Sequence, residues 1–163
     1  MQIIKALPLT KEAFAPFGDV IEISTAEKSH FINRGTTERF HNLTSAVAFG
    51  EDGHVIISMA RAQPFAPPIF LTKMERHPLG SQAFIPVSPT RFLITTAPDE
   101  NGKPGTPLAF LAAPGQGINY FRNTWHGVLT VLESVSDFLI IDREGEGKNL
   151  EEHQFTQAYQ IEI

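Results

Sequence analysis

Residues 75–86 read ERHPLGSQAFIP, and the rest of the chain is organised around this stretch. Two polar segments flank a turn that contains Pro and Gly, which predicts a β-hairpin. Successive side chains of a strand point to opposite faces, so Glu75 and His77 share one face and Arg76 points to the other. Gln82 lies on the second segment. The stretch therefore predicts that a carboxylate, an imidazole and an amide converge, as in a polar site.

Short apolar runs separated by turn signals fill most of the chain and indicate an all-β fold. Helix signal is nearly confined to residues 10–17, where Thr10 is a candidate N-cap. Residues 24–42 read as a loop or an edge segment, and the turn at 51–53 predicts a second hairpin. The pattern favours one domain over residues 1–163, an antiparallel barrel or a jelly roll with a short N-terminal helix. The expected strands are 3–7, 19–23, 44–49, 54–61, 69–77, 81–87, 91–97, 107–112, 117–122, 128–133, 135–142 and 155–163.

Composition excludes several classes of function. The net charge is −5 and no run of Lys or Arg occurs, so a nucleic-acid-binding surface is not expected. The absence of Cys removes thiolate catalysis and fits a reducing compartment. No apolar run approaches membrane-spanning length and no signal peptide opens the sequence, which predicts a cytoplasmic protein without a membrane partner.

A second polar stretch lies at residues 115–127, which read GQGINYFRNTWHG. His126 directly precedes an apolar run, so its imidazole is expected at the entrance of a strand, where barrels carry their ligands. Asp142 and Arg143, near the end of a later strand, read as an ion pair or a strand-end feature.

Together the two stretches resemble the paired motifs of the cupin superfamily, in which the first motif carries two His and a Glu and the second one more His. Glu75, His77 and Gln82 stand at the positions of the first motif, and His126 stands at the position of the second. Two of the four residue types differ from the family pattern. The resemblance implies a jelly roll whose mouth holds these four side chains, and they are the expected ligands if a divalent metal is bound.

A narrower resemblance covers nearly the whole chain and points to the bacterial ureidoglycolate lyase family. It implies cleavage of ureidoglycolate to glyoxylate and urea in allantoin (purine) breakdown, and a homodimer. The chain has Phe121 and Gly127 where the family often has His. Besides residues 75–86, the resemblance rests on residues 17–21, 61–64, 117–120, 125–126 and 137–143.

Such an elimination needs a base for the substrate hydroxyl and an acid for the departing nitrogen. His77 and His126 are the first candidates because imidazoles titrate near neutral pH. Glu75 is an alternative base, if burial raises its pKa.

The substrate also needs a cation for its carboxylate and groups for its ureido end. Arg122 is the first candidate for the carboxylate because a guanidinium donates two parallel hydrogen bonds. Asn119, Tyr120 and Gln82 are candidates for binding the rest of the substrate.

A divalent metal would replace the acid–base roles with ligand roles. Two imidazoles, a carboxylate and an amide oxygen suit nickel, manganese, iron or zinc, and no organic cofactor is expected. Two alternative functions remain open. One is a non-catalytic module that binds a small organic acid, and the other is a metal-dependent cupin acting on another hydroxy acid or a sugar.

Overall fold

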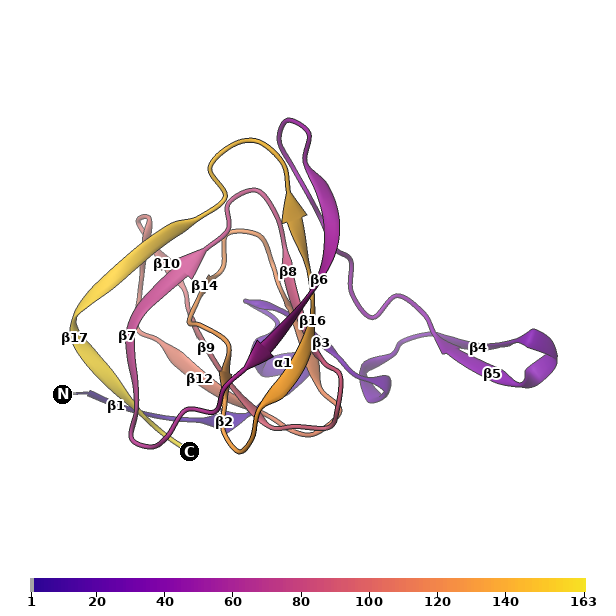
Figure 1. Ribbon diagram of the computed structural model, residues 1–163, viewed down its shortest axis with the longest axis horizontal. Coiled ribbons are helices and arrows are strands. Elements are labelled where there is room, and N and C mark those ends of the chain that lie inside the picture. Colours follow the sequence, from indigo (N-terminus) through magenta and orange to yellow (C-terminus); the bar gives the residue numbers. More distant parts are fainter. Residues whose placement is uncertain (1) are drawn as a thin grey trace.

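The computed structural model describes residues 2–163 and consists mainly of two β-sheets (Figure 1). The larger sheet has eight strands in the order β1-β17-β7-β14-β9-β12-β2, with β15 also paired to β9. The smaller sheet has five strands in the order β3-β13-β8-β16-β6. The strands of the larger sheet are β1 (Gln2–Lys5), β2 (Leu7–Pro8), β7 (Ile69–Arg76), β9 (Phe92–Ala97), β12 (Leu108–Ala112), β14 (Trp125–His126), β15 (Thr130–Val131) and β17 (Glu151–Glu162). Those of the smaller sheet are β3 (Gly18–Ile21), β6 (His54–Ala62), β8 (Gln82–Pro86), β13 (Gly117–Tyr120) and β16 (Ser136–Glu144).

The larger sheet curls until its two edges meet. β1 runs parallel to β17 at one edge, β2 runs parallel to β12 at the other, and only Ala6 separates β1 from β2. The N-terminal segment 2–8, which contains both strands, therefore joins the two edges and nearly closes the ring that Figure 1 shows around β7, β17 and β12. The predicted all-β, jelly-roll-type barrel is confirmed.

One α-helix, α1 (Lys11–Phe14), follows β2. Thr10 caps it as predicted, since its hydroxyl oxygen accepts a hydrogen bond from the Ala13 amide at 3.2 Å. The helix ends at Phe14, within the predicted range 10–17, and a turn then leads to β3, which begins at Gly18. A Cβ atom there would lie 2.1 Å from the carbonyl oxygen of Asn119, so the two strands can approach this closely only with glycine.

Two apolar clusters stabilise the fold. One fills the space between the two sheets and includes Phe14, Phe110, Ile118 and Phe138. The other packs against the opposite side of the larger sheet, within its curl, and includes Ile69, Leu71, Met74, Trp125 and Ile161. The larger sheet is therefore apolar on both faces, and the polar side chains of the site lie on the face that looks toward the smaller sheet.

The predicted hairpin at residues 75–86 is wrong. β7 pairs with β14 and β17, whereas β8 pairs with β13 and β16, so the turn between them crosses from one sheet to the other. The hairpin turn at 51–53 is also wrong, because residues 44–49 form only one isolated bridge, between Ala48 and Gly80.

The segment predicted as a loop or edge, residues 24–42, contains a separate hairpin. β4 (Ser29–Ile32) and β5 (Thr37–Phe40) pair only with each other; the 3₁₀ turn η1 (Ile23–Thr25) precedes them and the 3₁₀ turn η2 (Asn33–Gly35) connects them. This hairpin projects far from the barrel (Figure 1). A second small hairpin joins β10 (Asp99–Glu100) to β11 (Lys103–Pro104). Within residues 2–163, none of the helices has the length and apolar character needed to cross a membrane.

Candidate active site

Three side chains of the kinds that bind metal ions meet on the face of the larger sheet that looks toward the smaller sheet. Glu75 lies near the end of β7 and His77 directly follows the strand, while His126 on β14 is the cross-strand partner of Glu75. One carboxylate oxygen and one ring nitrogen from each imidazole all lie within 4.8 Å of one another. The Glu75 carboxylate is 4.0 Å from Nε2 of His77, and the two imidazole centroids are 5.2 Å apart.

The smaller sheet supplies the other wall of this site. The ring of Tyr120 on β13 stacks on the imidazole of His126, with centroids 4.3 Å apart and planes 10° apart. Gln82 on β8 is the cross-strand partner of Tyr120, so both side chains leave the same face of the smaller sheet. The structure thus brings together five of the predicted residues: Glu75, His77, Gln82, Tyr120 and His126.

Backbone carbonyls set the tautomer of both imidazoles. Nδ1 of His77 lies 2.8 Å from the carbonyl oxygen of Asn149, and Nδ1 of His126 lies 2.9 Å from that of Gly127. Because a carbonyl only accepts hydrogen bonds, each Nδ1 carries the proton in the neutral ring. The lone pair of each Nε2 is then free to bind a cation.

Buried polar atoms without a hydrogen-bond partner are concentrated at this site. Among residues 2–163 there are five, and four of them are His77 Nε2, His126 Nε2, Gln82 Oε1 and Thr96 Oγ1. Thr96 belongs to the site because it is the cross-strand partner of His126 on β9. Each such atom costs about 1–3 kcal/mol when left unpaired, so their grouping is typical of a site that binds a ligand.

Burial controls the charge of two side chains at this site, His126 and Tyr120. It lowers the pKa of His126 to about 3, with a smaller contribution from nearby His77, so the ring is neutral near pH 7. Burial, followed by the negative charge of Glu75, raises the pKa of Tyr120, so the phenol keeps its proton. His126 is therefore suited to donating a lone pair, and Tyr120 to donating a hydrogen bond.

The donor set fits a divalent metal. Two neutral imidazoles and one carboxylate are ligands that zinc, nickel, iron and manganese accept. Both imidazoles also donate their other N–H group to a carbonyl oxygen, which is the arrangement that orients ligand histidines in metal sites. Glu75, His77 and His126 thus form a Glu/His/His site, and Gln82 Oε1 is a further buried oxygen without a hydrogen-bond partner.

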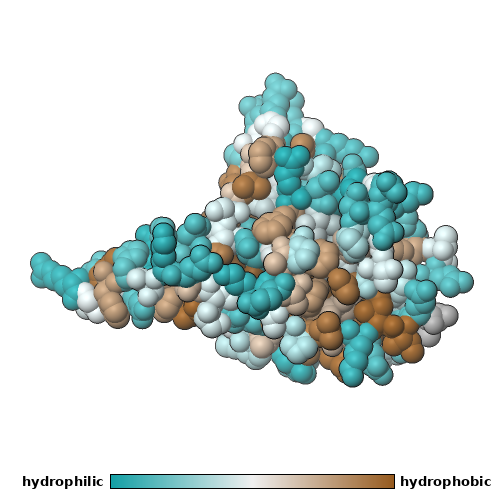
Figure 2. All heavy atoms as spheres, turned by 180° about the vertical axis from the view of Figure 1, so that it is seen from behind, coloured by the Kyte–Doolittle hydropathy of each residue, from teal (hydrophilic) through white to brown (hydrophobic). Residues whose placement is uncertain are grey.

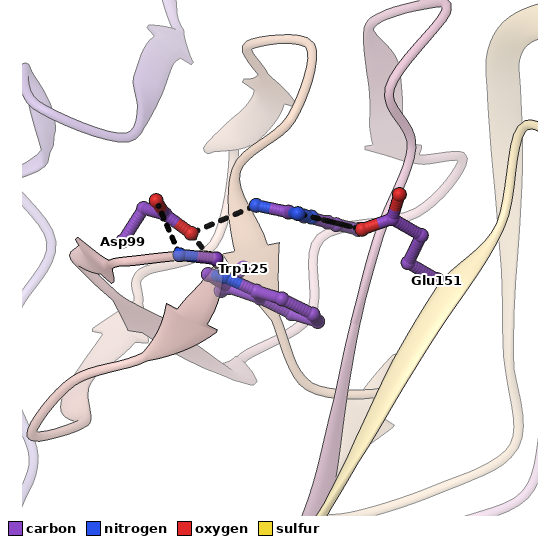
Figure 3. Close-up of polar contacts among 5 residues, drawn as sticks. Asp99, Trp125 and Glu151 are labelled. Atoms are coloured by element: carbon purple, nitrogen blue, oxygen red, sulfur yellow. Dashed lines mark hydrogen bonds and ion pairs between the residues drawn. The ribbon is translucent and has the colours of Figure 1, made fainter.

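Arg76 points to the opposite face, as strand alternation predicts. Its guanidinium donates to Glu151 at 2.6 Å and to Asp99 at 2.7 Å, and it lies 4.5 Å from the centre of the Trp125 ring. Trp125 in turn donates its indole N–H to Asp99 at 2.9 Å (Figure 3). This network fixes the residues beside the metal-ligand side chains, since Arg76 separates Glu75 from His77 and Trp125 precedes His126.

Two predicted substrate-binding residues lie elsewhere. Asn119 precedes Tyr120 on β13, so it leaves the outer face of the smaller sheet, where its amide donates to Thr44 Oγ1 and to the Ser45 carbonyl. Arg122 follows the end of β13, and its guanidinium lies 4.6 Å from the centre of the Phe49 ring, lining an outer cavity of about 560 Å³. Neither side chain takes part in the Glu/His/His cluster.

Three residues at the site were not found from the sequence. They are Thr96, Asn149 and Asp142, whose carboxylate accepts a hydrogen bond from Gln82 at 3.2 Å. The expected ion pair of Asp142 with Arg143 is not formed, because Arg143 donates to the carbonyls of Phe49, Gly145 and Glu146. The one sequence feature that could have pointed to this contact was Asp142 itself, an acidic residue that follows the apolar run 138–141 in β16.

The fold and the site define a class of protein, a near-closed β-barrel with a candidate Glu/His/His metal centre between its sheets. The sequence matches the family model described as "Ureidoglycolate lyase" over residues 1–162. This chain belongs to the ureidoglycolate lyase family.

Relatives named "Ureidoglycolate lyase" match this chain over nearly their whole length. The protein from Chelativorans sp. (strain BNC1) is 55% identical over 163 residues, which is 100% of this chain and 98% of that protein. The protein from Mesorhizobium japonicum is also 55% identical, with 100% and 99% covered. Among solved structures, RmlC from Streptococcus suis in complex with dTDP-D-xylose is similar at a TM-score of 0.44 and 14% identity, covering 90% of this chain and 74% of that one.

Proposed function

We propose that this chain is a carbon–nitrogen lyase that cleaves ureidoglycolate to glyoxylate and urea, a step of allantoin breakdown in purine catabolism. The observation that carries the proposal is the full-length match to ureidoglycolate lyases at 55% identity. A cytoplasmic location is part of the same proposal and rests on the family and on the absence of Cys.

The reaction rearranges one hydroxyl proton and one bond. The substrate carbon carries a hydroxyl, a carboxylate and the ureido nitrogen. As the hydroxyl loses its proton and becomes the carbonyl of glyoxylate, the carbon–nitrogen bond breaks and its electron pair leaves with the nitrogen, which gains a proton to give urea. No water is consumed, so the site must move a proton and stabilise negative charge on the substrate oxygens.

Glu75, His77 and His126 would hold a divalent metal, with the Gln82 carbonyl oxygen beside them. Such an ion supplies Lewis-acid chemistry, which lowers the pKa of a bound hydroxyl and attracts a carboxylate. The chain's own residues support this role. His126 is neutral near pH 7, so it is a good ligand and a poor acid or base, and Glu75 is the anionic side chain of the cluster.

Tyr120 completes the proposed mechanism on the opposite wall. Its hydroxyl stays protonated because burial and the charge of Glu75 raise its pKa. A hydrogen bond from this hydroxyl to the ureido carbonyl would stabilise the negative charge that develops on the departing group. In the same proposal Asn119 shapes the smaller sheet from its outer face and does not contact the substrate. Arg122 likewise has no substrate contact, since its guanidinium stacks on Phe49.

The chain departs from the family pattern at positions 121 and 127, and both positions lie outside the Glu/His/His cluster. Their location supports a lyase over a non-catalytic module. Phe121 lines the outer cavity and takes no part in the Glu/His/His cluster. A Cβ atom at Gly127 would lie 2.1 Å from Thr95 Oγ1, so this backbone leaves no room for an imidazole. The missing histidines therefore remove nothing from the cluster.

The direct test incubates the purified protein with ureidoglycolate and measures both products, with a reaction without protein to subtract spontaneous decay. Urea and glyoxylate in equal amounts are expected. Ammonia as the nitrogen product would indicate a hydrolase and contradict the proposal. A chelator followed by reloading with nickel, manganese, iron or zinc tests the metal, since full activity after complete metal removal would contradict a metal role.

We also propose that the protein forms a homodimer through the projecting hairpin. Phe31 on β4 is 67% exposed, and an isolated two-stranded hairpin is at best marginally stable in water. Figure 2 shows hydrophobic atoms on the surface of this hairpin beside hydrophilic ones. The edge strand β6 also exposes an apolar row, in which Ile57 is 72% exposed, so both surfaces have apolar area that a second copy would cover.

A further inference from the structure

Asp142 controls which end of the Gln82 amide faces the site. Gln82 Nε2 donates to Asp142 Oδ2 at 3.2 Å, across the paired strands β8 and β16. A carboxylate only accepts hydrogen bonds, so it binds the amino group of the amide and not the carbonyl oxygen. The amide is thereby held with its oxygen turned away from Asp142.

The oxygen that is turned away is buried and has no hydrogen-bond partner. Gln82 is the cross-strand partner of Tyr120, and the Tyr120 ring stacks on His126. The Gln82 side chain therefore extends into the space that also holds the unpartnered Nε2 atoms of His77 and His126. Phe138 and Ile140, which share this face of β16 with Asp142, are apolar and belong to or pack against the cluster between the sheets, whereas Asp142 is acidic.

We propose that Asp142 is a positioning residue that makes the Gln82 carbonyl oxygen a fourth donor to a divalent cation held by Glu75, His77 and His126. An amide without a fixed partner presents its amino group as readily as its oxygen, and the amino group would repel a cation. The hydrogen bond to Asp142 removes that orientation. This inference rests on the proposed metal centre. It assigns to Asp142 the orientation of the Gln82 amide, which none of the three ligands Glu75, His77 and His126 determines.

Asp142→Asn is the first test, with Ni²⁺ as the probe. Protein stripped of metal is titrated with Ni²⁺ in a calorimeter, and thermal unfolding of each variant confirms that it is folded. The asparagine accepts as well as donates, so Gln82 loses its fixed orientation. Ni²⁺ binding is expected to weaken by about 10–100-fold, the usual effect of removing a partner of a metal ligand.

The double variant Gln82→Glu with Asp142→Asn separates positioning from packing. In it the asparagine amino group donates to one oxygen of the glutamate, and the other glutamate oxygen faces the cation. Ni²⁺ affinity is expected to return at least to the level of the unmodified protein. Because a glutamate strengthens Ni²⁺ binding by its charge alone, the double variant is compared with Gln82→Glu, in which Asp142 and the new carboxylate repel each other. Positioning by residue 142 predicts tighter Ni²⁺ binding in the double variant than in Gln82→Glu, and equal affinities would contradict it.

The pair of Gln116 and Glu22 provides a matched control. Gln116 Nε2 donates to Glu22 Oε1 at 3.1 Å, and Gln116 lies on the strand-connecting turn before β13, outside the Glu/His/His cluster. Glu22→Gln therefore breaks the same kind of amide–carboxylate contact and is expected to leave Ni²⁺ affinity unchanged.

Each result decides one proposal. Unchanged Ni²⁺ affinity in folded Asp142→Asn, or a folded double variant without recovery, overturns the role of Asp142 alone. An unmodified protein that takes up no Ni²⁺, manganese, iron or zinc overturns both the metal centre and this role. Turnover of ureidoglycolate by the unmodified protein is measured separately and decides the proposed lyase activity.

Discussion

The ring of Tyr120 and the imidazole of His126 lie nearly parallel, with their centroids 4.3 Å apart. Tyr120 ends β13 of the smaller sheet and His126 ends β14 of the larger one, so this stack joins the two sheets at the candidate site. It covers one face of the imidazole and contributes to the burial that keeps His126 neutral. The same contact therefore links the packing of the barrel to the chemistry of the candidate metal site.

Tyr120→Phe should lower catalysis while keeping the stack. The phenyl ring preserves the contact with His126, but the substrate loses the proposed hydrogen bond. We expect kcat to fall by about 10²–10³-fold with little change in Ni²⁺ affinity, as when one charge-stabilising donor is removed. Tyr159→Phe is the control, since the chain has two tyrosines and Tyr159 packs near Phe155 in the other apolar cluster. Unaltered kcat in Tyr120→Phe would contradict the role of the hydroxyl.

Protonation of His126 should destabilise the metal-free protein in acid. Its pKa is about 3 in the folded protein and about 6.5 in the unfolded chain, so the unfolded state binds the proton more readily. This contribution to stability is complete above pH 6.5 and is lost as the pH falls toward 3. The free energy of unfolding should decrease by about 1.4 kcal/mol per pH unit in that window from this group.

The check compares urea unfolding at several pH values for the unmodified protein and for His126→Asn, which has no imidazole to protonate at this position. The variant should be less stable at pH 7 and show a smaller pH slope. His30→Asn, on the projecting hairpin, should keep the original slope. An identical slope in His126→Asn would show that other groups carry the acid sensitivity.

Arg76→Lys should destabilise the fold more than the same change at an exposed site. The Arg76 side chain is only 12% exposed and its planar guanidinium serves Glu151, Asp99 and Trp125 together. Lysine cannot reproduce that geometry, so we expect a loss of about 1–3 kcal/mol in urea unfolding. Arg61→Lys is the control, because its pair with Asp137 is 72% exposed on the arginine side and should contribute about 0–1 kcal/mol. Equal losses would contradict a special role for the network.

Phe31→Ser should weaken the proposed dimer without unfolding the barrel. The Phe31 side chain is exposed and is not part of the barrel core. Its replacement should therefore leave the melting temperature of the monomer unchanged. Light scattering coupled to size exclusion should show a dimer for the unmodified protein and a larger monomer fraction for the variant. Lys28→Ser, at the base of the same hairpin, controls for general effects on this segment. A monomeric unmodified protein would rule the dimer out.

The sequence predicted those parts of the site that depend on local geometry. Strand alternation separated Glu75 and His77 from Arg76, because that rule needs only the two neighbouring residues in the strand. The same rule separates Asn119 from Tyr120, yet both were grouped as substrate residues because they share one motif. A motif places residues near each other along the chain, but strand parity decides which face of the sheet each one occupies.

Sheet pairing could not be predicted in the same way. The turn between β7 and β8 has the composition of a hairpin turn, but each strand finds its partners far away in the chain. Asp142 was missed for this reason, since its contact with Gln82 depends on the register between β8 and β16. The position of Arg122 outside the Glu/His/His cluster could not be predicted, because the chain leaves the strand after Tyr120, where alternation no longer applies.

The N-terminal segment 2–8, which joins both edges of the larger sheet, also constrains when the protein can fold. Gln2 pairs with Tyr159 and Lys5 pairs with Glu162, so these contacts cannot form during synthesis until the C-terminal strand has left the ribosome. Until then the other edge strands of the sheet remain open to pairing with other chains. Such long-range pairing is slow to form, so the ring of the larger sheet closes only as one of the last steps, after synthesis of the whole chain.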